Sequence, residues 1–144
     1  MKVIVTVLLF CLSAAGFVPV ASAHEKRVVA GQFEFIVGFI NEPAFSGQMN
    51  GVDLRVTQKN KPVENLEGQL KVVVMRSDVD KTLELAFSKK YNDPGRYAAH
   101  FLPAKPGKYI FRIIGTINGA VIDEQFESGE KFHDVNDVAP LQFP

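Results

Sequence analysis

The sequence predicts an all-β domain, an antiparallel β-sandwich of about seven strands. Along most of the chain, apolar residues recur at every second position, which is the period of a half-buried strand. Short polar turns rich in Pro, Gly and Asn separate these runs. A sustained helical pattern is not seen in the body of the chain. Short strands at this spacing are typical of two sheets packed face to face.

Seven runs carry the alternating pattern. They cover residues 32–40, 52–58, 69–75, 82–87, 96–102, 108–117 and 120–126. In the second run Val52, Leu54 and Val56 face one way and the polar residues between them face the other, and the other runs alternate in the same manner. The side chains expected at the centre of the core are Phe35, Leu54, Val72, Leu85, Tyr97 and Phe111.

Turn residues show how the runs connect. Asn118-Gly119 lies between the last two runs and is the strongest hairpin signal in the chain. Pro94-Gly95 and Pro106-Gly107 mark two further turns. The stretch over residues 92–119 resembles the last strands of immunoglobulin-like sandwiches, in which Tyr109 is either a tyrosine corner or a plain core aromatic. The resemblance implies an immunoglobulin-like antiparallel β-sandwich following a cleaved signal peptide.

The N-terminus has the pattern of an export signal. Lys2 supplies a positive charge, residues 3–12 form an apolar run too short to span a bilayer, and residues 21–23 offer small side chains for cleavage. The alternative is an uncleaved N-terminal anchor. Cleavage after Ala23 leaves residues 24–144 as a single domain with a short polar C-terminal tail, in the periplasm or secreted.

Composition argues against several classes of function. Without Lys2 the chain has 15 basic and 16 acidic residues, so we expect no nucleic-acid partner. Cys11 lies in the export signal, which leaves the mature chain without disulfides or a thiolate metal site. A second long apolar run is missing, so no membrane span is expected after cleavage. The sequence has no Gly-x-Ser-x-Gly or His-Glu-x-x-His motif, and we expect no enzyme.

The export signal and the layout of residues 28–126 resemble the small exported domains of the YtkA/FixH-like group and, more loosely, CopC-like copper proteins. CopC-like proteins begin their mature chains with a histidine, and cleavage after Ala23 makes His24 the first residue here. Its α-amine and imidazole would chelate one ion through two nitrogens. A second imidazole would complete the three-nitrogen set that Cu(II) accepts well. The resemblance implies this role for His24 alone.

Two other histidines are candidates for that second imidazole. His133 lies in a polar C-terminal segment beside Asp134, which would be a weak ligand or would orient the imidazole. His100 lies on the outward face of an expected strand. The Asp-x-His arrangement of CopC-like proteins is missing, and we favour His133 because its segment is expected to move. The alternative is that all three histidines are surface residues and no cofactor is bound.

The loop between the first two expected strands suggests a different function. It carries Phe45 and Met49 among polar residues. Long loops on a sandwich often carry binding sites, so these two side chains would dock an envelope protein. The alternative, which we favour for Phe45, is that its ring closes the open end of the sandwich. Two functions therefore remain, a non-enzymatic exported interaction module that docks on another envelope protein and a periplasmic Cu(II) carrier.

Mass spectrometry of the exported protein tests the mature N-terminus. We expect the first residue to be His24, because the small residues before it match the preference of a signal peptidase. A different first residue would contradict the chelate, since the α-amine and the imidazole would then belong to different residues.

Overall fold

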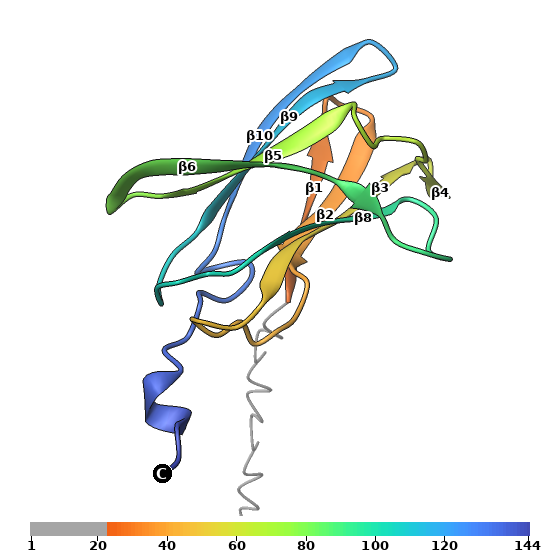
Figure 1. Cartoon of the computed structure of the whole chain (residues 1–144). Coiled ribbons are helices and arrows are strands. Elements are labelled where there is room, and N and C mark those ends of the chain that lie inside the picture. Colours follow the sequence, from red (N-terminus) through yellow and green to blue (C-terminus); the bar gives the residue numbers. More distant parts are fainter. Residues whose placement is uncertain (1–22) are drawn as a thin grey trace, which may run out of the picture.

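Two antiparallel sheets packed face to face form the domain (Figure 1). The structure is a computed structural model that describes residues 23–144, so the predicted export signal lies outside the described residues except for Ala23. Within residues 23–144, no helix is long and apolar enough to cross a membrane. The two sheets confirm the predicted β-sandwich and are consistent with the immunoglobulin-like class.

The first sheet has six strands in the order β1-β2-β3-β8-β7, and β4 pairs with the far end of β3. Its strands are β1 (His24–Val29), β2 (Phe33–Phe39), β3 (Asn50–Gln58), β4 (Lys61–Pro62), β7 (Ser88–Lys89) and β8 (Arg96–Phe101). The period-two pattern does not predict β1, whose exposed and half-buried residues are mostly charged. This strand forms because its backbone pairs with β2 along its whole length.

The second sheet has four strands in the order β10-β9-β5-β6. Its strands are β5 (Leu70–Arg76), β6 (Val79–Ala86), β9 (Ile110–Ile117) and β10 (Ala120–Glu127), and a 3-10 helix η1 (Ala139–Leu141) follows near the C-terminus. Asn118 and Gly119 have positive φ angles of 49° and 83° between β9 and β10, which confirms the predicted hairpin turn.

The inner faces of the two sheets form one apolar core. Five of the six predicted central residues are buried, and the exception is Leu85, which is only partly buried. Leu85 lies on β6, an edge strand whose residues are mostly exposed. Leu85 of β6 does face the core, as the alternation predicts. Because β6 is an edge strand, however, Leu83 stays 46% exposed.

Aromatic rings fill one end of the core. Phe39 of β2 contacts Phe111 of β9 edge to face, with ring centroids 5.1 Å apart. Phe132 packs on both, at 5.9 Å from Phe39 and 5.7 Å from Phe111. These three rings link the first sheet, the second sheet and the segment that follows β10.

Of the two alternatives for Tyr109, the structure shows the tyrosine corner. Its hydroxyl donates a hydrogen bond of 2.9 Å to the backbone carbonyl of Lys105, four residues upstream. The ring is buried beside Phe39 and Phe101. The turn before β9 is therefore tied to the aromatic end of the core.

The chain after β10 is not the polar tail that the sequence suggests. Phe132 and Val135 are buried, and Val135 exchanges backbone hydrogen bonds with Gly107. Asn136 forms a parallel bridge with Phe45. Phe132 and Val135 lie five and eight positions after the end of β10 and form no alternating pattern. Only the tertiary contacts therefore reveal that the segment closes the end of the sandwich.

Truncation of Phe111 tests the aromatic core. Phe111→Ala should lower the free energy of unfolding by about 3–5 kcal/mol, because it deletes a fully buried ring that touches Phe39 and Phe132. The matched control is Phe143→Ala, since Phe143 is 96% exposed and its loss should change stability little. Denaturant titration of both variants gives the comparison, and equal stabilities would refute this core.

Candidate functional site

Several predicted site residues gather at one end of the sandwich. Figure 1 shows the start of β1, the loop between β2 and β3 and the segment after β10 at this end. His24 is the first residue of β1, Glu42 lies in the loop, and His133 lies in the segment. Three parts of the chain that are remote in sequence therefore meet here.

The ring of His24 lies on the backbone of β2. His24 pairs with Gly38, which in turn pairs with Asp53 of β3, so these residues form one row on the outer face of the sheet. A Cβ atom at Gly38 would approach the ring atoms Cδ2 and Cγ of His24 to 2.7 and 2.9 Å. Such contacts are closer than packed carbon atoms tolerate. Glycine at position 38 thus makes the space that the imidazole occupies.

Asp53 holds that imidazole from the far side of the glycine. The Nε2 atom of His24 lies 3.0 Å from Oδ2 of Asp53. Arg96 of β8 donates to the same carboxylate from its Nε at 2.9 Å and from its Nη2 at 2.8 Å. Asp53 is only 3% exposed although it lies on the outer face, because the histidine and the arginine cover it. The sequence pattern correctly predicts its facing but not its burial.

The charge of Asp53 is stabilised where it lies. Burial raises the pKa of Asp53, but hydrogen bonds from His24 and Arg96 and the charge of Arg96 more than offset this, so the pKa is lowered from its ordinary value. Asp53 is therefore a carboxylate that positions His24 through Nε2.

Glu42 has the opposite environment. Its side chain is 13% exposed, and neither carboxylate oxygen has a hydrogen-bond partner. Burial raises the pKa of Glu42, and the nearby His133 and His24 act against that rise. The sequence analysis missed Glu42, because a glutamate before a proline in a loop has no pattern that separates it from a surface residue.

The other predicted ligands are placed differently. His133 is 56% exposed in its side chain, and its Nδ1 lies 3.8 Å from Oε2 of Glu42. His100 is exposed on the same face as His24, but β2 and β3 lie between them. At about 4.8 Å per strand the two histidines are roughly 14 Å apart across the sheet, so the structure does not bring them together.

Asp134 has a structural contact instead of one with His133. Its Oδ1 accepts a short hydrogen bond from the hydroxyl of Ser128, which also accepts a hydrogen bond of 3.0 Å from the backbone N–H of Tyr109. Ser128 is buried. This arrangement holds the end of β10 against the start of β9, and it accounts for the carboxylate of Asp134.

The side chains of the described residues do not form a metal-binding site by themselves. Within residues 23–144, no three His, Cys, Asp or Glu residues are grouped as metal ligands. A chelate through the α-amine and imidazole of one histidine does not need such a group, because a single residue supplies both nitrogens. The prediction that His24 binds a metal therefore depends on cleavage after Ala23.

The predicted docking residues differ from each other. Phe45 is half-buried and bridges to Asn136, while Met49 is 63% exposed. Neighbouring Ala44 and Ser46 are buried. The middle of this loop is therefore packed on the sandwich, while Met49 is a large apolar side chain that the loop presents to solvent.

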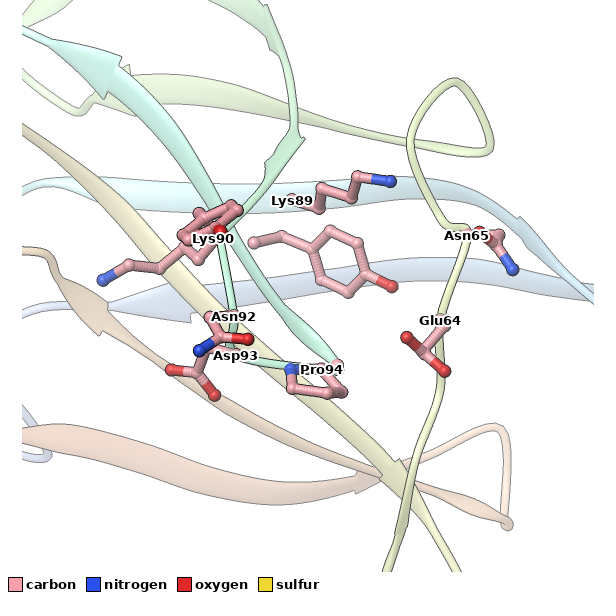
Figure 2. A pocket seen from close by; sticks show the side chains of 10 residues that line it. Glu64, Asn65, Lys89, Lys90, Asn92, Asp93 and Pro94 are labelled. Atoms are coloured by element: carbon pink, nitrogen blue, oxygen red, sulfur yellow. The ribbon is translucent and has the colours of Figure 1, made fainter.

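A pocket lies beside the start of β8. Figure 2 shows Glu64 and Asn65 on one side of it and Asn92, Asp93 and Pro94 on the other. Asp93 is already paired with Arg55 and Arg96 at 3.3 and 3.2 Å. The pocket has acidic, basic and amide groups without a common charge, so it indicates no ligand class.

No family model and no curated protein matches the chain. Among solved structures, the chain is similar to FetP of uropathogenic Escherichia coli strain F11, crystallised as isolated after recombinant expression in the periplasm of E. coli. The identity is 14%, the match covers 79% of this chain and 96% of that chain, and the TM-score is 0.42. A likeness this distant does not decide function, and the resemblances to the YtkA/FixH-like group and to CopC-like proteins stay predictions.

Replacement of Asp53 tests the histidine contact. Asp53→Asn should lower stability at neutral pH by about 1–3 kcal/mol, because charged hydrogen bonds to His24 and Arg96 are lost in a buried position. The folded-state pKa of Asp53 is below its unfolded value, so its contribution is full above about pH 4 and is lost as the pH falls through the folded pKa. The stability difference between wild type and variant should therefore shrink in acid.

The control for this test is Asp123→Asn. Asp123 pairs with Arg112 at 2.7 Å, but both side chains are about half exposed, so its removal should cost little. Denaturant titrations of all three proteins from neutral to acidic pH give the comparison. Equal losses for the two variants would contradict the role assigned to Asp53.

Proposed function

We propose that this protein is an exported, non-enzymatic domain that binds and carries Cu(II) at its mature N-terminus. The observation that carries the proposal is the hydrogen bond between Nε2 of His24 and the buried carboxylate of Asp53. Metal-binding histidines usually donate the other ring N–H to a carboxylate or a carbonyl, which fixes the ring and its tautomer. Asp53 is placed to do this for His24.

The chemistry of the chelate agrees with that contact. An α-amine and an imidazole on the same residue close a six-membered ring with a metal when the ring nitrogen is Nδ1. The Nε2 atom is then left to Asp53, so metal binding and the observed hydrogen bond are compatible. Copper bound there would be a Cu(II) ion in a nitrogen-rich site, which suits its preference.

The surroundings favour a rigid site. Gly38 lets the ring of His24 lie close against β2, and Arg96 holds Asp53 in place. A ring fixed in this way loses little freedom on binding, which increases affinity. The exposed side chain of His133 at the same end is the candidate for a further imidazole, in keeping with the sequence analysis.

The interaction module has less support from the geometry. Its two residues are Phe45, which is half-buried, and Met49, which is exposed. A single exposed methionine is common on protein surfaces and does not define a docking site. We keep this function as the alternative that stands if the copper test fails.

Titration with Cu(II) tests the proposal on the protein as exported, beginning at His24. We expect 1:1 binding that His24→Ala weakens by at least a hundredfold. One glycine placed before His24 should have a similar effect, because it separates the α-amine from the imidazole. Affinity should also fall as the pH is lowered, since protons compete for nitrogen ligands.

The matched control is His100→Ala. His100 is exposed on the same face but two strands lie between it and His24, so this variant should bind like the wild type. If the native and glycine-extended proteins have the same affinity for Cu(II), the carrier function is wrong.

A further inference from the structure

A mostly apolar groove lies where the edge strand β6 faces the end of β8. Its lining includes Phe101 and Tyr109, which belong to the core and are 7% and 5% exposed. Leu83 and Leu102 also line it, and they are 46% and 49% exposed. Single apolar side chains are common on protein surfaces, but two beside an opening to the core form a continuous apolar site.

The groove is large enough for more than one apolar side chain. Its volume is about 280 Å³, and a cavity of about 150 Å³ with apolar walls already holds a benzene molecule. A further β-strand is a poor occupant, because Lys81 of β6 lines the groove and an inward-pointing charge on an edge strand opposes strand addition. The groove therefore suits a short segment that inserts its side chains.

Residues 137–143, here called the projecting segment, carry side chains of that kind. Figure 1 shows the segment leaving the sandwich, and its 3-10 helix η1 buries none of its residues. Leu141 is 66% exposed and Phe143 is 96% exposed. The backbone N–H of Val138 donates to the hydroxyl of Ser46 at 3.3 Å, which attaches the base of the segment to the β2–β3 loop. One copy thus exposes both the apolar segment and the groove.

The segment and the groove are complementary in charge. Among the described residues, those that line the groove include two cations, Arg76 and Lys81, and no carboxylate. Asp78 pairs with Arg76 at 2.8 Å, so the exposed Lys81 is the cation that a partner would meet. The projecting segment contains Asp137, which is exposed, and no Lys or Arg. Opposite charges would therefore meet at the rim of the groove.

We propose that two copies of this protein exchange their projecting segments, and that Leu141 and Phe143 of each copy fill the groove of the other. Exchange around a two-fold axis fills both grooves, so the assembly closes as a dimer. Asp137 of one copy then lies near Lys81 of the second copy. The contact involves neither His24 nor a metal, so it is independent of the proposed copper function.

Sedimentation velocity over a range of concentrations tests this dimer, on the protein beginning at His24 and with a chelator present. Wild type should change from monomer to dimer as its concentration rises. Phe143→Ser and Leu83→Ser should each weaken dimerisation by about tenfold or more, because each removes an apolar side chain from the contact. The matched control is Val121→Ser, since Val121 is 76% exposed on β10 at the opposite edge of the second sheet and should not affect dimerisation.

A mixture of the two weakened variants distinguishes exchange from a dimer of another kind. Phe143→Ser keeps an intact groove and Leu83→Ser keeps an intact projecting segment, so a mixed pair forms one complete contact. The mixture should therefore dimerise more strongly than either variant alone. Phe143→Ser, diluted until it is monomeric, should unfold like monomeric wild type, because its contact lies between copies.

A charge exchange extends the test if Leu83→Ser folds poorly. Lys81→Glu should weaken dimerisation, and the addition of Asp137→Lys in the same chain should restore it. A wild type that stays monomeric at every concentration would overturn the inference. A dimer that neither Phe143→Ser nor Lys81→Glu weakens would also overturn it, because the copies would then associate through another surface. Neither result would affect the proposed copper function.

Discussion

The contact among Phe39, Phe111 and Phe132 is the constraint on which this end of the molecule depends. It joins one strand from each sheet to the segment after β10, with centroid distances between 5.1 and 5.9 Å. Burying three rings is worth several kcal/mol, which offsets the entropy lost in fixing a polar segment. Because His133 directly follows Phe132 and Glu42 lies three residues after Phe39, the same contact brings their side chains together.

The two carboxylates at this end show how differently one fold treats similar groups. Asp53 receives hydrogen bonds from Arg96 and a contact from His24, so its burial is compensated. Glu42 is largely buried without a close hydrogen bond on either oxygen, and its ion-pair partner is His133, whose Nδ1 lies 3.8 Å from Oε2. A protein that keeps an uncompensated carboxylate gives up stability at that position, and such losses concentrate at functional sites. The contrast is the physical reason for assigning a positioning role to Asp53.

The edges of the sandwich are closed in a way that also serves the site. Arg27 of β1 donates to Glu124 at 3.0 Å and to the carbonyl of Gln125 at 2.9 Å, and its guanidinium lies 4.3 Å from the ring centroid of Phe126. These contacts tie β1 across the open side to β10. A first strand held in this manner keeps His24 at a fixed position, although His24 is its terminal residue.

The sequence by itself determined the class of fold and the facing of most strands, because period-two alternation and Pro, Gly and Asn turns are local signals. It also offered the tyrosine corner as one of two alternatives for Tyr109 and singled out His24. Only the tertiary structure decided that the segment around His133 is packed, that Asp53 is buried on the outer face, and that the carboxylate of Glu42 is largely buried beside His133. These properties arise from contacts between segments that are remote in sequence. A polar residue that makes such a contact does not contribute to the alternating apolar pattern, so the sequence does not reveal it.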